Sequence, residues 1–174
     1  MPDVSIRPAT PADIPAITRV YADAVKSGTA SFELTAPDEA EMARRMNELL
    51  PKDFPYLAAE MDGRLAGYAY AGLYRARPAY RFTLEDSVYI APDCQGCGVG
   101  RALLAALIEA STARGFRQMI AVIGDSEQAA SIGLHAALGF AYVGTFPNVG
   151  FKFGRWLDTV LMQRALGPGS TTAP

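Results

Sequence analysis

One stretch of the sequence has residue types and a spacing that suit phosphate binding. Glycine stands at every second position from Gly96 to Gly100, after a strand-like run (residues 87–90) and before a helical pattern (residues 101–113). Glycines in such a turn leave main-chain N–H groups uncovered, and the N-terminus of a helix favours an anion in front of it. The pattern therefore predicts a phosphate-binding turn.

The spacing of this turn differs from the two best-known phosphate loops. It is G-x-G-x-G rather than G-x-G-x-x-G, and no Gly-Lys-Ser/Thr follows. A glycine turn with a purely structural role is the alternative at this level of evidence.

Two cysteines in the same stretch suggest a different chemistry. Cys94 and Cys97 form a C-x-x-C before a helix, which is the local arrangement of a thiol redox site. The glycine spacing continues past Cys97, and no proline stands between the two thiols, so redox catalysis is the weaker interpretation. Structural zinc is weaker still, because four ligands are needed and no second cysteine pair exists. The sequence therefore predicts no metal.

Length, charge and hydropathy limit the class of protein. The chain has 174 residues, half of them hydrophobic and a fifth charged, which predicts one globular domain over residues 1–166 and a flexible tail over residues 167–174. The net charge of −2 argues against a general nucleic-acid binder. No leader-like or membrane-spanning apolar stretch and no disulfide framework are present, so we expect a cytoplasmic protein that does not bind membranes.

The hydrophobic periodicity and the turn residues predict alternating strands and helices. Helix starts are indicated at residues 10–13 and 35–38, and Asp62-Gly63 indicates a hairpin. Strands are expected at residues 4–7, 56–60, 65–73, 87–90, 119–123, 140–145 and 157–163, and helices at residues 10–27, 35–50, 101–113 and 127–138. This order predicts a mixed α/β (α+β) protein with one sheet flanked by helices.

The glycine turn and the segments after it resemble a known family. The run Gln95-Gly96-x-Gly98-x-Gly100 is similar to the acyl-CoA signature of the GNAT superfamily of N-acetyltransferases. The resemblance covers most of the chain, from residues 6–9 to Leu166, and includes residues 130–135, 138–140 and 150–158. Within the superfamily, the run at residues 83–90 and an aromatic, basic C-terminal loop resemble phosphinothricin and methionine sulfoximine N-acetyltransferases.

This resemblance implies a fold and a co-substrate. The fold would be a mostly antiparallel mixed sheet of about seven strands with about four helices, and the co-substrate would be acetyl-CoA. The turn would cradle the pyrophosphate, and the backbone of the preceding strand would pair with the pantetheine arm, one of its N–H groups facing the oxyanion of the reaction. The implied cofactor-binding residues are Val88, Tyr89, Ile90, Gln95, Gly96, Cys97, Gly98, Val99, Gly100, Arg101, Glu127, Gln128 and Ser131. Many relatives have Asn at the position of Gln128, which puts that contact in doubt.

Two residues match the catalytic positions of the family. An amine attacks a thioester only when it is neutral, so one proton must leave the nucleophile, and the thiolate takes up another. Glu85 matches the proposed base and is expected just before the pantetheine strand, with the side chain of Asp86 on the opposite face. His135, the single histidine, stands where many members carry the tyrosine that protonates the thiolate. A solvated Glu85 and a packed His135 are the alternatives.

The substrate would be a small amine with an amino-acid-like body. Arg75 and Arg77, in the loop before the strand, suit a carboxylate or phosphinate. The expected substrate-binding residues are Phe32, Arg75, Ala76, Arg77, Tyr80, Glu85, Asp86 and Ser87. Phe82 and Trp156 are further wall candidates, and Lys152 and Arg155 could act across a homodimer interface that the resemblance implies.

Two other functions compete with this interpretation. An enzyme that acetylates protein N-termini would share the fold and the cofactor. A non-catalytic acyl-CoA sensor would bind CoA and turn over no amine.

Overall fold

The computed structural model describes residues 3–174, so Met1 and Pro2 of the predicted domain lie outside the described part. The β-strands are β1 (Val4–Pro8), β2 (Tyr56–Met61), β3 (Arg64–Leu73), β4 (Thr83–Ile90), β5 (Gln118–Gly124), β6 (Ala141–Lys152) and β7 (Arg155–Ala165). The α-helices are α1 (Ile14–Ser27), α2 (Glu39–Leu49), α3 (Val99–Ala113) and α4 (Ala129–Ala137). Short 3-10 turns stand at Pro11–Asp13, Leu50–Lys52, Pro78–Tyr80 and Pro92–Cys94.

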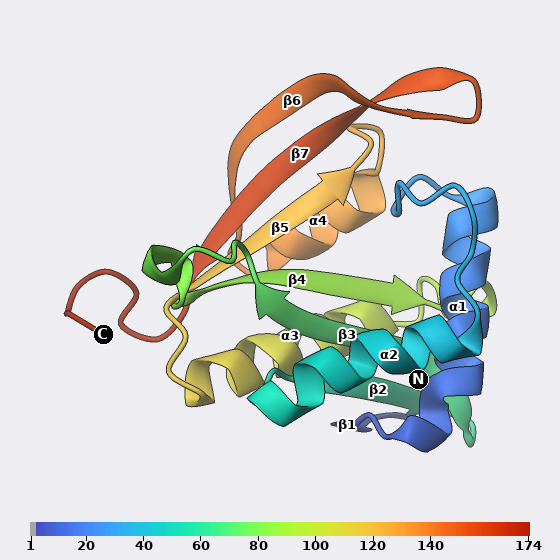
Figure 1. Cartoon of the computed structure of the whole chain (residues 1–174), viewed down its shortest axis with the longest axis horizontal. Helices are drawn as coiled ribbons and strands as arrows, with labels where there is room; N and C mark the ends of the chain where they lie inside the picture. Colours follow the sequence, from blue (N-terminus) through green and yellow to red (C-terminus); the bar gives the residue numbers. More distant parts are fainter. Residues whose placement is uncertain (1–2) are drawn as a thin grey trace.

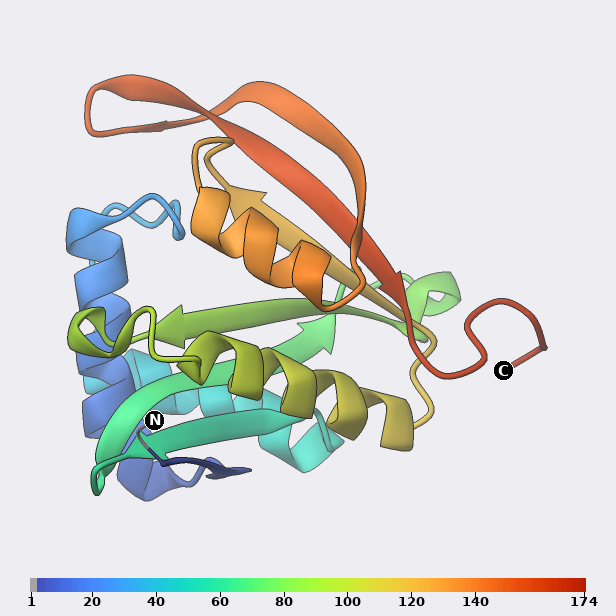
Figure 2. The same cartoon turned by 180° about the vertical axis from the view of Figure 1, so that it is seen from behind.

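The strands form one seven-stranded sheet in the order β1-β2-β3-β4-β5-β7-β6. All neighbours are antiparallel except β4 and β5. Helices α1 and α2 cover one face of the sheet (Figure 1), and α3 and α4 lie on the other (Figure 2). The predicted fold class and the order of the elements are therefore confirmed.

The core lies mainly between β2–β4 and the helices on both sides. Leu103, Leu104 and Leu107 of α3 are fully buried, as are Ile17 of α1 and Tyr68 of β3. The buried positions of β2 and β3 include many small residues, and these allow α3 to pack closely on the two strands. This well-packed half of the sheet includes β4, the strand that borders the opening described below.

The two N-terminal helix starts differ in detail from the prediction. Thr10 precedes a 3-10 turn in which the Asp13 carboxylate accepts from the Thr10 main-chain N–H at 2.7 Å, and the α-helix proper begins at Ile14. The second helix begins at Glu39 rather than near Thr35, because Asp38 is the residue whose side chain accepts the Glu41 N–H, at 2.9 Å.

The strand at the predicted pantetheine position is longer than expected. It begins at Thr83 rather than Ser87, so Glu85 lies inside β4 and not before it. Two adjacent acidic residues obscure the strand pattern in the sequence. They are tolerated here because β3 pairs with the strand from Leu84 onward and Asp86 has a partner on α4.

The helices beside the cofactor segments also have shifted bounds. Helix α3 begins at Val99, so Val99 and Gly100 belong to its first turn. Helix α4 begins at Ala129, which leaves Glu127 and Gln128 in the turn before it.

The predicted aromatic, basic C-terminal loop is a β-hairpin. β6 runs to Lys152 and β7 starts at Arg155, with a two-residue turn between them. Gly144 and Gly150 interrupt the strand pattern in the sequence, and two register irregularities near them let β6 continue. The hairpin extends past the rest of the sheet (Figure 1).

The last residues follow β7 in a series of turns. Arg117 donates to the main-chain carbonyls of Gly169, Thr172 and Ala173 at 2.9 to 3.4 Å. The flexibility predicted for residues 167–174 stays a prediction.

Candidate functional site

The sheet opens between its two parallel strands. β4 pairs with β5 only from Thr83 to Glu85, whereas it pairs with β3 along its whole length from Leu84 to Ile90. Beyond Glu85 the two strands diverge, so the edges of β4 and β5 that face each other keep unpaired N–H and C=O groups. A cleft of about 620 Å³ occupies this opening. Figure 2 shows α3 and α4 at the side where the strands part.

The glycine turn lies at one end of this cleft, and Gln95 and Gly96 are among the lining residues. Gly96 and Gly98 have φ values of +74° and +84°, a conformation that favours glycine, and a Cβ atom on either would meet nothing within 4 Å. Among the described residues, the first main-chain N–H of this region with a protein acceptor is that of Ala102, which bonds to Gly98. The amides from Gln95 to Arg101 therefore have no main-chain acceptor in the described part of the chain and stand at the N-terminus of α3, as an anion site requires.

Glu85 is half-buried in the lining of the cleft. Burial is the main cause that raises the pKa of its carboxyl; the charge of Asp86 raises it further, and the charge of Arg75 opposes the rise. A carboxylate with a raised pKa is a stronger base than one in water. Side chains of a strand point alternately to its two faces, so Glu85 and Tyr89 share one face of β4 and Asp86 lies on the other. Tyr89 packs against Tyr21 of α1, which places Glu85 on the α1 face of the sheet.

Asp86 faces the other side and contacts α4. Its Oδ2 atom lies 2.9 Å from His135 Nε2, and His135 Nδ1 lies 2.8 Å from the Ser131 carbonyl oxygen. Burial lowers the pKa of His135, but the hydrogen bond to the Asp86 carboxylate and its charge outweigh burial, so the net pKa is raised. Both side chains are about 95% or more buried and belong to the cleft wall.

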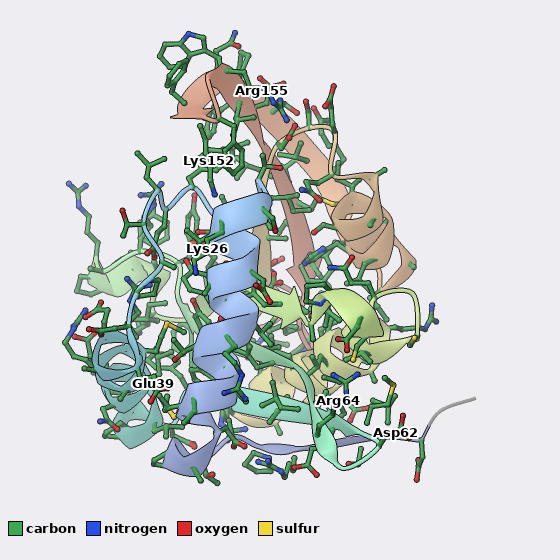
Figure 3. The ribbon with its side chains drawn as sticks, turned by 90° about the vertical axis from the view of Figure 1, so that its right-hand side faces the viewer. Lys26, Glu39, Asp62, Arg64, Lys152 and Arg155 are labelled. Atoms are coloured by element: carbon green, nitrogen blue, oxygen red, sulfur yellow. The ribbon has the colours of Figure 1, made fainter. Side chains whose placement is uncertain are left out.

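The loop after α1 carries Phe32, which lines the cleft beside the C-terminal end of β5. The Phe32 ring packs where Gly124 of β5 and Gly150 of β6 leave room: a Cβ on Gly124 would lie 2.7 Å from the ring, and one on Gly150 would overlap it. Lys152, which is buried, donates to the carbonyls of Gly28 and Ser31, each at 2.8 Å. Figure 3 shows Lys152 between this loop and the hairpin. Lys152 thus holds the loop of its own chain.

Asp125 ties the same loop to the β5–α4 turn. Its Oδ2 accepts from Thr29 Oγ1 at 2.9 Å and from Arg155 at 2.7 Å. The Gln128 side-chain amide donates to Thr29 Oγ1 at 2.9 Å, and the Glu127 N–H donates to Asp125 Oδ1 at 3.1 Å. The side chain of Gln128 and the N–H of Glu127, both predicted to contact the cofactor, are therefore engaged within the protein.

The structure brings most predicted site residues together, from five different elements or loops. Those that line the cleft are Phe32, Glu85, Asp86, Ser87, Val88, Tyr89, Ile90, Gln95, Gly96, Gln128, Ser131 and His135. Cys97, Gly98, Val99, Gly100 and Arg101 continue the glycine turn into α3. Arg75, Ala76, Arg77 and Tyr80 are exposed on the loop after β3 and do not line the cleft.

Several lining residues were not expected from the sequence. They are Ala24, Ala30, Ser31, Tyr70, Ala121, Val122, Ile123, Gly124, Ala130, Leu134 and Thr159. The residues of β5 could have been found from the topology, because a strand parallel to the pantetheine strand must form the other wall. Tyr70 carried no signal beyond that of a core strand residue.

The competing thiol and metal sites find no support in the geometry. Cys94 is buried, and burial and Asp93 raise the pKa of its thiol, which opposes the reactive thiolate of a redox site. Within residues 3–174 no group of three or more His, Cys, Asp or Glu side chains is placed to hold a metal ion. No helix in the same range is long and apolar enough to span a membrane.

The fold and the site define an acyltransferase architecture. Its two parallel strands separate, and beside them lies a turn whose main-chain N–H groups have no main-chain acceptor in the described part of the chain. The family model of the acetyltransferase (GNAT) domain matches residues 6–161. The chain therefore belongs to the GNAT family of N-acetyltransferases.

Characterised relatives are similar over almost the whole chain. The phosphinothricin N-acetyltransferase of Alcaligenes faecalis is 60% identical over 93% of this chain and 82% of its own length. An L-methionine sulfoximine/L-methionine sulfone acetyltransferase of Pseudomonas aeruginosa is 44% identical over 94% of this chain and 95% of its own. The crystal structure of a phosphinothricin acetyltransferase from Sinorhizobium meliloti with AcCoA matches with a TM-score of 0.96 and 48% identity, covering 98% of this chain and 92% of that one.

Proposed function

We propose that the protein transfers the acetyl group of acetyl-CoA directly to the α-amine of a small amino-acid-like substrate. Phosphinothricin, methionine sulfoximine and methionine sulfone are the best candidates, since relatives at 60% and 44% identity carry these names. The observation that carries the proposal is the position of a half-buried carboxylate, Glu85, at the point where the sheet divides. At that point one cleft can receive a thioester from the α3 side and an amine from the α1 side.

The residues around the cleft fit acetyl-CoA, which supplies an acetyl group activated as a thioester. The unpaired amides from Gln95 to Arg101 would hold its diphosphate, and the open space over Gly96 and Gly98 leaves room for close approach. The free edge of β4 from Val88 to Ile90 would bind the amide-bearing arm, as an added strand does. Ser131 at the start of α4 lines the same cleft.

Glu85 would serve as the general base. It lines the cleft together with Ser87, Tyr70 and Phe32. Its raised pKa makes it a better acceptor for the proton of the attacking amine, directly or through a water. His135 would supply a proton to the departing thiolate.

Substrate recognition would use the loop after α1 and the loop after β3. Phe32, held between two glycines, would limit the length of the substrate side chain. Arg75, whose charge acts on Glu85, is the better candidate for the substrate carboxylate, with Ala76, Arg77 and Tyr80 beside it. Ser87 would contact the substrate from β4.

The proposal includes a homodimer in the cytoplasm. The β6–β7 hairpin exposes Tyr142, Phe146, Phe151, Phe153 and Trp156, each more than half accessible. Several exposed aromatic side chains along a projecting hairpin, with Phe151 and Trp156 in contact, suit contact with a second copy. The two free thiols agree with a reducing compartment.

Release of CoA in the presence of individual amines tests this function. We expect turnover with methionine sulfoximine, methionine sulfone or phosphinothricin, and none with peptides that have free N-termini. Turnover confined to peptides would favour protein N-terminal acetylation, and CoA binding without turnover of any amine would favour a sensor.

The Glu85→Gln variant tests the role of the base. We expect kcat to fall by about 10²- to 10⁴-fold with little change in acetyl-CoA affinity. Glu39→Gln, on the exposed start of α2, is the matched control. Equal activity of both variants would remove Glu85 from its role.

A further inference from the structure

His135 and Asp86 form a buried pair whose geometry determines how many protons it holds. His135 Nδ1 lies 2.8 Å from the Ser131 carbonyl oxygen, and Nε2 lies 2.9 Å from Asp86 Oδ2. The ring also packs edge-on against Phe140, with the ring centres 4.9 Å apart. Both ring nitrogens therefore have a protein partner in the structure without substrate.

The Ser131 carbonyl determines the first proton. A carbonyl oxygen only accepts, so the short contact requires a hydrogen on His135 Nδ1. A neutral imidazole with Nδ1–H presents a lone pair at Nε2, and the Asp86 carboxylate presents lone pairs as well. Two acceptors cannot stand 2.9 Å apart without a hydrogen between them. The pair therefore holds a second proton, on Nε2 or on Oδ2, and its net charge is zero.

The surroundings oppose loss of this second proton. Asp86 Oδ1 is buried and has no hydrogen-bond partner among the described residues, so a lone carboxylate here would be poorly solvated. β5 carries no ionisable side chain, and α4 carries none besides His135. Charged groups on the packed elements include Glu85 on β4 and Arg164 of β7, which bonds to the Leu138 carbonyl at the end of α4. Within residues 3–174, no lysine or arginine side chain forms a hydrogen bond with Asp86.

We propose that Asp86 is a positioning residue that fixes His135 with hydrogen on Nδ1 and stores, between Nε2 and Oδ2, the proton that the departing thiolate takes. This role differs from the substrate contact expected for Asp86 from the sequence, and it rests on the acetyl transfer proposed above. The amine nitrogen bonds to the acetyl carbon and passes one proton to Glu85. The carbon–sulfur bond breaks, its electron pair stays on sulfur, and sulfur receives the stored proton. Glu85 then loses its proton and the pair regains one through solvent, which restores the enzyme.

Nitrogen NMR of the intact protein measures this proton count directly. His135 is the single histidine of the chain, so protein labelled with ¹⁵N-histidine gives one pair of ring signals. At pH 8 we expect Nδ1 to be protonated and Nε2 to be protonated or strongly hydrogen-bonded. A neutral ring with hydrogen on Nε2 alone would overturn the proposal, whatever the activity.

Asp86→Asn separates positioning from proton storage. The Asn amide can donate to Nε2 and keep hydrogen on Nδ1, but it cannot supply the second proton. We expect the Nδ1–H form to persist and kcat to fall about 10²-fold, while the KM for the amine and the affinity for acetyl-CoA stay close to wild type. In Asp86→Ala the ring should also lose its preference for Nδ1–H. Asp53→Asn, an exposed carboxamide exchange near α3, is the control for both readouts.

The outcomes distinguish this proposal from the proposed function. If the wild-type protein acetylates an amine and Asp86→Asn keeps full kcat, the storage role fails and the function stands. If the wild type acetylates no amine, the function fails and with it the destination of the proton, even where the NMR signals match. If neither variant folds, the wild-type ring signals still decide the proton count.

Discussion

The two edges of β4 show how one strand serves two purposes. On one edge it pairs with β3 from Leu84 to Ile90, and on the other it pairs with β5 only from Thr83 to Glu85. The first edge is bonded along its length and stabilises the sheet. The second leaves its polar groups unpaired beyond Glu85, and the residues proposed for chemistry lie where the pairing ends. The difference teaches that the site of this protein is an interruption of a regular element rather than an addition to it.

Stability should depend on the paired region and much less on the open one. Leu84 is fully buried on β4, so Leu84→Ala is expected to lower the free energy of unfolding by about 2–5 kcal/mol. Val122 on the open part of β5 is 38% exposed, and Val122→Ala should cost less than about 1 kcal/mol. Urea denaturation measures both values. Similar losses would show that the open part of the sheet is as important for stability as the paired part.

The cleft wall that Phe32 forms should be sensitive to a single methyl group. In Gly150→Ala the new Cβ overlaps the Phe32 ring, and relief of such overpacking costs about 1–3 kcal/mol. We expect the displaced ring to raise the KM for the amine about tenfold, measured by initial rates. Gly144→Ala is the matched control, since its Cβ meets nothing within 4 Å on the same strand. A KM unchanged in both variants would mean that Phe32 does not contact the substrate.

The two ends of α3 offer a test of the anion turn. Gly98 and Gly115 have φ values of +84° and +83°, with open space around each. Alanine at either position should cost roughly 1–2 kcal/mol of stability. Calorimetry should show weaker acetyl-CoA binding for Gly98→Ala alone, because its methyl group would occupy open space in the turn proposed to hold the diphosphate. Equal dissociation constants for the two variants would contradict a diphosphate at this turn.

The smallest expected effect concerns pH. Glu85 accepts a proton only when ionised, so kcat/KM should rise with pH through a pKa above the ordinary 4.5 of a glutamate. Arg75 lowers this pKa, so Arg75→Gln should move the acid limb to higher pH. Arg81→Gln should leave the limb in place, since Arg81 stacks on Phe82 and donates to the Pro78 carbonyl. A limb that does not move in Arg75→Gln would place this arginine too far away to act on the base.

The sequence was sufficient for the features that depend on local rules. The glycine turn, the hairpin at Asp62-Gly63 and the order of strands and helices follow from backbone conformation and hydrophobic period, which neighbouring residues determine. A family pattern with a recognisable spacing also selected Glu85, Gln95 and His135 as site candidates, and all three line the cleft; their roles stay predictions.

Tertiary contacts decided what local rules could not. The acidic pair Glu85–Asp86 is part of a strand only because β3 pairs with it and His135 gives Asp86 a hydrogen bond. β6 continues past Gly144 and Gly150 only because β7 lies beside it. The proton held by His135 depends on the Asp86 carboxylate, which lies 49 residues away in the chain. Only folding brings Asp86 Oδ2 to within 2.9 Å of His135 Nε2. Each of these features depends on the interaction energy between two groups that are close in the fold but distant in the sequence.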